Sequence, residues 1–349
     1  MAHSAVFRTF AAIHCFHRIS TVLSFFRNNQ TTTSLALAVY VAILHLPAVA
    51  GWVPMPEGLG VKGGLLYGDL MGWAAASPKL SALAAALLVF GQAILLNYLA
   101  DRYRMMDDRS WVPGLMYALT ASSIPDFQFL SPALVGVTFI PVALLRQFGV
   151  YKQNMAYGPI FDTAFWLGLG SLFYPPVAWC LVPAFMGFFS LRSFSAKEQI
   201  IFLTGIVVPV FLGFTLYFWF DQPGAFWTRQ LSEGLAIGRL SWSGLAFAVQ
   251  LKFGLIGALL LIVLLGFNVY YFKKLIQVQK YITILFWFLL ANLLSACVHS
   301  GMRVEYCLLL MPSVAIFFAY AFSSLRNAII AEALHLTLLA AAFYLMFVQ

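Results

Sequence analysis

The sequence predicts an all-α protein, a polytopic transmembrane helix bundle of about eleven spans (10–12) whose N-terminus lies inside the cell. The first observation is composition: 62% of the 349 residues are hydrophobic and 9% are charged, whereas about a quarter of the residues of a soluble domain are charged. The second is that the apolar residues form runs long enough to cross a bilayer. The third is that basic residues are concentrated in alternate connections, which predicts an orientation.

The predicted spans follow from the apolar runs and from the residues that interrupt them. Runs of about 17–25 residues suffice to cross the hydrocarbon core. Breaks fall where proline, glycine or charge cluster, as at Pro175-Pro176, because tandem prolines cannot continue a helix. We expect membrane helices over 33–51, 79–100, 111–126, 131–147, 158–175, 176–191, 199–219, 243–270, 281–298, 305–323 and 328–347.

The orientation follows from the lysines and arginines, which are retained on the cytoplasmic side of a membrane. With the N-terminus inside, six of these twenty residues lie in outer segments or in the outer half of a span: Lys62, Lys79, Arg229, Arg239, Lys252 and Arg303. The other fourteen lie in inner segments: Arg8, Arg18, Arg27, Arg102, Arg104, Arg109, Arg146, Lys152, Arg192, Lys197, Lys273, Lys274, Lys280 and Arg326.

One integral membrane domain is expected over residues 33–349, preceded by an interfacial extension over residues 1–32. Basic residues interrupt the apolar character of this extension, which disfavours a cleaved signal peptide. A helix on the membrane surface and, over residues 1–18, a disordered extension are the two alternatives. Two long outer loops stand out. Residues 52–78 are rich in glycine, and residues 220–242 combine aromatic and leucine side chains with charges, as in an amphipathic helix at the interface.

The residue inventory excludes several kinds of site. The four cysteines show no CxxC spacing, and the histidines in or near spans lie at scattered depths, which disfavours haem and non-haem iron. No Walker A, GxSxG, HExxH or Rossmann signature is present. Lys252 is interpreted as a side chain that snorkels outward. No cofactor is assigned, and a divalent cation is the one that stays open.

Charged residues on the predicted inner side have structural explanations. Asp162, Glu198 and Glu332 lie in or near the first turn of outward-running helices, where the helix dipole favours negative charge. The outer charges either form a site for an anionic lipid headgroup, with a carboxylate as base, or are ordinary interfacial charges. This outer set comprises Glu57, Asp69, Asp126, Asp221, Arg229, Arg239, His299, Arg303 and Glu305.

Several stretches carry a resemblance to a polytopic inner-membrane family of Bacteroidota, over roughly residues 20–349. They are SFFRNNQ, LNYLADRY, SSIPDFQFLSP, FDTAFWLGLGSLFYPP and RVEYCLLLMPSVAIFFAYAF. This resemblance implies a multi-pass protein of the bacterial inner (cytoplasmic) membrane.

The general plan also resembles the GT-C class of membrane glycosyltransferases. Shared features are many spans, acids in the first outer loop and a late R-x-x-Y, here Arg303 to Tyr306, before a proline-containing span. The resemblance implies sugar transfer from a polyprenyl-phosphate donor on the outer face. An acid of the first loop, Glu57 or Asp69, would then be the catalytic residue. Lipid phosphate would be bound by Arg229, Arg239 and Arg303, supported by His299, Glu305, Asp126 and Asp221.

Two functions remain open, with transport of a lipid or small molecule as a third. The first is a GT-C-like transferase of envelope glycan assembly. The second is a non-catalytic membrane subunit that scaffolds an envelope assembly or secretion complex. The sequence departs from the GT-C pattern because no acid precedes Glu57 at the outer end of the first span, and no DxD or ExD occurs there. Expected partners are a membrane lipid or lipid-linked sugar and other membrane proteins, and no nucleic acid.

Overall fold

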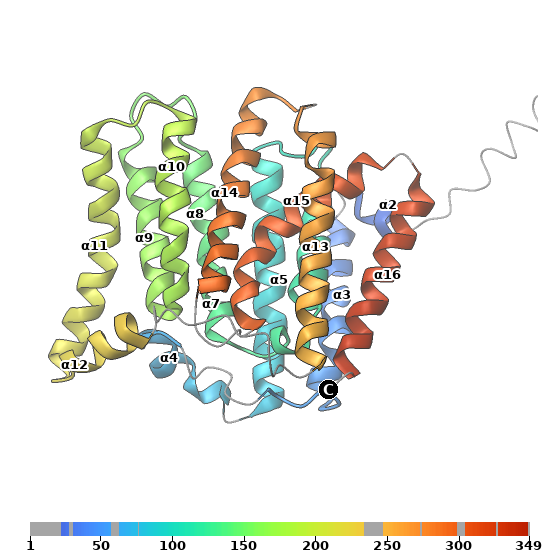
Figure 1. Cartoon of the computed structure of the whole chain (residues 1–349), viewed down its shortest axis with the longest axis horizontal. Coiled ribbons are helices and arrows are strands. Elements are labelled where there is room, and N and C mark those ends of the chain that lie inside the picture. The colour runs from blue at the N-terminus through green and yellow to red at the C-terminus, as the bar shows by residue number, and fades with distance from the viewer. Residues whose placement is uncertain are drawn as a thin grey trace, which may run out of the picture.

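A computed structural model describes residues 22–27, 31–56, 63–75, 77–233, 247–272, 274–298, 304–325 and 327–347 as a bundle of helices (Figure 1), with no strand among them. Every predicted apolar run corresponds to a helix or to two consecutive helical segments. The first half of the bundle contains α2 (Val22–Arg27), α3 (Thr31–Val49), α4 (Leu65–Ala75), α5 (Pro78–Arg102), α6 (Val112–Ala121), the 3₁₀ segment η1 (Pro125–Phe127), α7 (Pro132–Val137), α8 (Phe139–Phe148) and α9 (Tyr157–Phe173).

The second half begins at the tandem prolines. It contains the 3₁₀ segment η2 (Pro175–Cys180), α10 (Leu181–Leu191), α11 (Ala196–Trp219), α12 (Pro223–Phe226), the π-helical η3 (Trp227–Glu233), α13 (Phe247–Tyr271), α14 (Ile276–Val298), the 3₁₀ segment η4 (Val304–Leu310), α15 (Met311–Ser324) and α16 (Ala328–Phe347).

Seven segments of the described chain are long and apolar enough to cross a membrane. They are Thr32–Val49, Pro78–Arg102, Ala196–Trp219, Val249–Phe267, Ile276–Val298, Val304–Ser324 and Ile329–Phe347. Many of their large apolar side chains are exposed, as in α11, where Ile200, Leu203, Val207 and Phe211 lie on the surface. Exposed apolar surface of this extent is what acyl chains cover in a membrane. The chain is therefore a multi-pass membrane protein, and the number and direction of its crossings remain predictions.

The two ends of the bundle differ in charge. The end that carries the turns 103–111, 149–156, 192–195 and 272–275 is called the basic end here. The end that carries α4, η1, η2, α12, η3 and η4 is called the loop end (Figure 1). Described basic residues at the loop end are Lys79, Arg229 and Lys252. Those at the basic end are Arg27, Arg102, Arg104, Arg109, Arg146, Lys152, Arg192, Lys197, Lys274 and Lys280.

Close helix contact is made possible by small residues. The contact between α9 and α11 is the most extensive among the described helices. A Cβ atom added to Gly205 on α11 would lie 2.6 Å from the carbonyl oxygen of Phe161 and 2.8 Å from the Cβ of Ala164. Only glycine therefore fits at this position. The close approach that it allows matters because helices in membranes associate through close packing.

A buried polar network joins three helices in the centre of the bundle. The Tyr117 hydroxyl donates to Oε1 of Gln92 at 2.6 Å, and Nε2 of Gln92 donates to the Leu134 carbonyl and to the Thr138 hydroxyl, both at 2.7 Å. The break between α7 and α8 at Thr138 is thus tied to α5 and α6. Interhelical hydrogen bonds of this kind fix the relative positions of helices in a membrane.

The first described helix, α2, is docked against α16. The Glu332 carboxylate accepts hydrogen bonds from the backbone nitrogens of Val22 and Leu23, both at 3.1 Å, while the Leu23 and Phe26 side chains are buried. Glu332 thus satisfies two free amides of another helix rather than those of its own first turn. Residues 1–21 lie outside the described residues, so the extension over 1–32 remains a prediction.

Candidate site at the loop end

Short irregular segments meet inside the loop end. The described chain places η1 and α7 against η4, and the rings of Tyr174 and Tyr306 stack at a centroid distance of 6.0 Å. Non-helical backbone at membrane depth occurs where it is enclosed by protein or lines a cavity, and broken helices often mark binding sites. This junction is the candidate site.

The segment between α6 and α7 is mostly buried although its only helical part is the short 3₁₀ segment η1. Gln128 is buried, and its Nε2 donates to the carbonyl oxygens of Leu44 at 3.2 Å and Ser122 at 3.3 Å. The Ser81 hydroxyl accepts from the Leu130 amide at 2.9 Å. The side chains of Gln128 and of Ser81 on α5 therefore satisfy backbone groups of this segment and of α3, as burial requires. The prolines at 125 and 132 prevent a continuous helix from doing so.

An ion pair joins this segment to α13. The Lys252 ammonium lies 2.5 Å from the Asp126 carboxylate, and the two side chains are 14% and 17% exposed. Lys252 is the sixth residue of α13, so its charge lies below the helix end rather than beyond it. The pairing explains why a lysine is tolerated there, since charges within a membrane protein are paired. The sequence analysis interpreted Lys252 as snorkelling outward, and the structure adds a carboxylate partner for its ammonium.

Helix α4 contributes a tyrosine that lies between η4 and the α6–α7 segment. The Tyr67 hydroxyl donates to the Leu130 carbonyl at 2.9 Å. Burial, and secondly the negative charge of Glu305 on η4, raise the pKa of Tyr67 to about 12. The hydroxyl is therefore protonated at neutral pH and remains a hydrogen-bond donor.

The structure brings two of the predicted site residues to this junction. Asp126 on η1 and Glu305 on η4 lie on neighbouring segments. Asp69 is on α4, two residues after Tyr67, and its side chain lies outside the described atoms. Four further candidates, namely Glu57, Arg239, His299 and Arg303, also lie outside the described residues.

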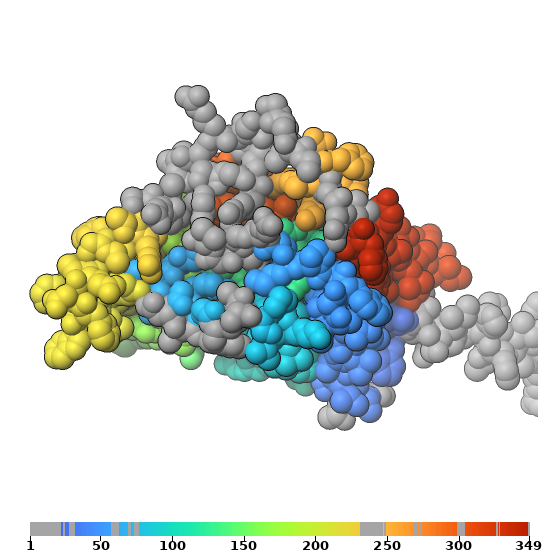
Figure 2. Space-filling view, turned by 90° about the horizontal axis from the view of Figure 1, so that it is seen from below, coloured from blue at the N-terminus to red at the C-terminus, as the bar shows by residue number. Residues whose placement is uncertain are grey.

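Two predicted site residues lie in the part of the loop end formed by the end of α11 and by η3. Asp221 follows α11 in a left-handed turn with φ of 56°, and Arg229 is exposed on η3. Figure 1 places α12 at one edge of the bundle, and Figure 2 shows the α11–η3 region (yellow) at one edge with α16 (red) at the other. The η3 segment is anchored there by Gln230, whose Nε2 donates to the Ser171 carbonyl at 2.6 Å.

Sequence reasoning missed Lys252, Tyr67 and Gln128 as members of the junction. A signal for the first was present, because Lys252 in the outer half of one predicted span and Asp126 at the outer end of another are isolated opposite charges on the same predicted side. No comparable signal marks Tyr67 or Gln128, since both use their polar atoms on backbone groups that any sequence provides.

Metal ligands do not gather in the part of the chain that the structure describes. Groups of three or more His, Cys, Asp or Glu side chains placed to hold an ion are absent among these residues. Binding of a divalent cation therefore remains a prediction for the acids of the first outer loop.

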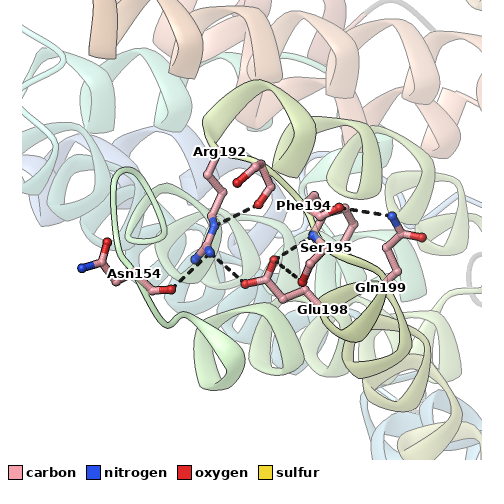
Figure 3. Close-up of polar contacts among 7 residues, drawn as sticks. Asn154, Arg192, Phe194, Ser195, Glu198 and Gln199 are labelled. Atoms are coloured by element: carbon pink, nitrogen blue, oxygen red, sulfur yellow. Dashed lines mark hydrogen bonds and ion pairs between the residues drawn. The ribbon is translucent and has the colours of Figure 1, made fainter.

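A second polar cluster lies at the basic end and closes the turn between α10 and α11 (Figure 3). Arg192 Nη2 lies 2.9 Å from Oε1 of buried Glu198 and donates to the Asn154 carbonyl at 3.3 Å. Oε2 of Glu198 accepts from the Ser195 amide at 3.0 Å and from its hydroxyl at 3.1 Å. Both carboxylate oxygens are occupied, so this cluster stabilises a helix start and is not a catalytic site.

Comparison with known proteins finds a likeness among solved structures and none among family models or curated sequences. The structure is similar to that of ArnT from Cupriavidus metallidurans bound to undecaprenyl phosphate, with a TM-score of 0.52 and 14% identity over 89% of this chain. The aligned part is 62% of that protein's chain, so this chain corresponds to about three fifths of it. At this identity the likeness shows the fold alone, and it agrees with the predicted polytopic helix bundle.

Proposed function

We propose that the protein is a GT-C-like transferase of envelope glycan assembly, which transfers a sugar from a polyprenyl-phosphate donor at the loop end. The observation that carries the proposal is the ArnT-like fold, since the similar structure contains bound undecaprenyl phosphate. The junction of η1, η4 and α4 supports it, because irregular buried segments under a membrane surface are typical of substrate sites. The proposal includes location in the bacterial inner membrane with the basic end toward the cytoplasm.

The reaction assigns roles to the outer residues. A carboxylate of the first outer loop, Glu57 or Asp69, accepts the proton of the acceptor hydroxyl while its oxygen attacks the anomeric carbon. The bond between that carbon and the phosphate oxygen breaks, and polyprenyl phosphate leaves with the electron pair. Arginine stabilises the charge that develops on the phosphate, a role proposed for Arg229, Arg239 and Arg303.

The remaining residues have supporting roles in this proposal. Asp126, held by Lys252, and Glu305, beside Tyr67, shape the floor of the site from η1 and η4. His299 belongs to the same connection as Arg303, and Asp221 sets the turn that leads to Arg229. A divalent cation, where the reaction uses one, would be held by the first-loop acids.

Binding and turnover are tested separately on the full chain. Undecaprenyl phosphate is added to the detergent-purified protein and its binding is measured by native mass spectrometry. Turnover is measured in proteoliposomes that contain a panel of undecaprenyl-phosphate-linked hexoses, by release of undecaprenyl phosphate. We expect Glu57→Gln or Asp69→Asn to lower turnover by on the order of 100-fold or more, as for loss of a general base, and to leave lipid binding intact.

Asp108→Asn is the matched control, because Asp108 is an exposed acid at the basic end. It should retain full turnover. Full turnover in both Glu57→Gln and Asp69→Asn would overturn the assignment of the catalytic acid. Absence of undecaprenyl phosphate binding by the unmodified protein would overturn the proposed substrate class.

The second candidate is a non-catalytic subunit that scaffolds an envelope assembly or secretion complex. It is favoured by the structural use of the polar groups at the junction, where Asp126 is paired and the Tyr67 hydroxyl is bound to backbone. Gentle-detergent purification distinguishes the two. A defined complex that binds undecaprenyl phosphate without turning over its sugar-linked form supports the scaffold, whereas a lone protein with turnover excludes it.

A further inference from the structure

A groove at the basic end lies between α5 and α8. It encloses about 370 Å³ and is lined by Leu95, Tyr98 and Arg102 on α5 and by Val142, Leu145 and Arg146 on α8. Its position is distinct from the junction at the loop end, because Arg102 and Arg146 lie in the last turns of their helices at the opposite end of the bundle. The transferase proposal does not use any of these residues.

The groove begins on a surface that faces lipid. Leu80, Leu83, Leu87, Ile94 and Tyr98 are all exposed on α5, and their spacing of three, four and seven residues places them on one face of the helix. Acyl chains that lie along this face reach the groove at its apolar part, between Leu95 on one wall and Val142 with Leu145 on the other.

The other part of the groove is basic. Nη1 of Arg102 donates to the Tyr98 hydroxyl at 2.9 Å, and its guanidinium carbon lies 5.9 Å from the centre of the Tyr98 ring. Arg102 forms no ion pair with a described carboxylate. Arg146 has only a long contact, 3.6 Å from its Nε to the Asp162 carboxylate, between side chains that are 54% and 38% exposed. Such a pair contributes little and leaves the guanidinium available for a stronger partner.

The walls of the groove are tied together beside these cations. The Tyr103 hydroxyl donates to the Leu145 carbonyl at 2.5 Å, which joins the end of α5 to α8. Arg102 and Arg146 are therefore both held at the mouth of one groove, each in the last turn of a helix. Tyrosine at this level is typical of the interface between headgroups and acyl chains.

We propose that this groove binds an anionic phospholipid of the basic-end leaflet, with the headgroup phosphate at Arg102 and Arg146 and an acyl chain against Leu95, Val142 and Leu145. Guanidinium groups bind phosphate through paired hydrogen bonds. The apolar wall favours a lipid over free phosphate, because a soluble anion leaves that wall in water. Basic pockets between membrane helices on the cytoplasmic side bind anionic headgroups by the same chemistry.

The test compares lipids of identical acyl chains on the full-length protein. Phosphatidylglycerol or phosphatidylcholine is added to delipidated protein in a mild detergent, and retained lipid is counted by native mass spectrometry. We expect phosphatidylglycerol to be retained preferentially. Arg102→Gln and Arg146→Gln should each lower its retention by on the order of fivefold, with little effect on phosphatidylcholine.

Lys197→Gln is the matched control, since it removes the same charge at the basic end from α11, which does not line the groove. An equal loss of phosphatidylglycerol in Lys197→Gln, or no loss in either arginine variant, would overturn the proposal. Val142→Trp keeps both arginines and fills the apolar part. It should lower lipid retention while the thermal unfolding temperature stays close to that of the unmodified protein.

A competition experiment separates a lipid site from a site for soluble phosphate. Glycerol 1-phosphate carries the same phosphate group without acyl chains. We expect millimolar glycerol 1-phosphate to leave phosphatidylglycerol bound. Displacement of the lipid at that concentration, together with an unchanged affinity in Val142→Trp, would show a soluble-phosphate site and contradict the proposal.

Discussion

Lys252 and Asp126 are separated by 126 residues in the chain, and their charged groups lie 2.5 Å apart in the loop end. The pair connects α13, a helix with many lipid-exposed side chains, to the irregular segment that follows α6. Each residue explains the presence of the other, because a single charge at this depth is costly and an opposite pair is much less so. Asp126 is consequently a positioned anion rather than a freely available base.

Breaking this pair should destabilise the protein, and removing both charges should restore most of the loss. Loss of one partner of a fully buried pair costs about 3–5 kcal/mol. Because both side chains are partly exposed, we expect about 1–3 kcal/mol for Lys252→Met or Asp126→Asn. The loss of stability in each variant is measured as the change in the free energy or midpoint of unfolding in detergent. Lys79→Met, an exposed lysine at the same end, is the control. Strictly additive losses in the double variant would contradict direct coupling.

The contact between α9 and α11 should depend on the absence of a side chain at Gly205. Gly205→Ala places a methyl group 2.6 Å from the Phe161 carbonyl oxygen, so the helices must separate. Overpacking of this kind costs about 1–3 kcal/mol. Gly257→Ala on α13 is the matched control, because no atom lies within 4 Å of a Cβ built there. It should be neutral or slightly stabilising, since alanine favours a helix over glycine. Equal unfolding temperatures for the two variants would contradict this account.

The Arg192–Glu198 pair should contribute more to stability than the exposed Arg146–Asp162 pair at the same end of the bundle. Glu198→Ala leaves Arg192 without its carboxylate and frees the Ser195 amide (Figure 3). We expect a loss of about 2–4 kcal/mol, since Glu198 is buried. Asp162→Asn removes an exposed pair with Arg146 and should change stability by less than about 0.5 kcal/mol. Comparable losses in the two variants, measured by thermal unfolding, would exclude a special role for the α11 start.

The orientation can be tested with single cysteines and a membrane-impermeant maleimide. All four native cysteines are first replaced by serine, because Cys297 is exposed. With the basic end in the cytoplasm, a cysteine at position 229 should react in intact spheroplasts. A cysteine at position 152 should react only after the membrane is permeabilised. The reverse pattern would place the basic end outside and contradict the prediction from the lysine and arginine distribution.

Much of the helical organisation could be predicted because it depends on local chemistry. A bilayer offers no hydrogen-bond partners to the backbone, so each apolar run must form its own helix. The first-turn location of Glu198 was equally readable from the sequence, and the structure confirms it. Asp162 and Glu332 lie further into their helices than the N-terminal turn, and each has a specific partner, Arg146 and the α2 amides.

The candidate site was less predictable, because its members come from segments that are distant in the chain. The Tyr67 hydroxyl donates to the Leu130 carbonyl, and the pKa of Tyr67 is raised first by burial and secondly by the negative charge of Glu305, 238 residues later in the sequence. Neither the composition of the chain nor the spacing of its residues predicts that such distant residues act on one another. Arg229 is exposed on η3, and Phe226 just before η3 packs in one cluster with Leu65 of α4.

The sequence by itself determined that this protein is a membrane helix bundle, which stretches of the chain are apolar enough to form its long helices, and how its charges divide between the two ends. These properties follow from hydropathy, proline and charge, which act residue by residue. Only the tertiary structure decided which isolated charges pair and at which glycine two helices pack closely. It also decided that Arg102 and Arg146 line one groove. Those outcomes depend on the relative rotation and depth of helices, which are set by the packing of the whole bundle.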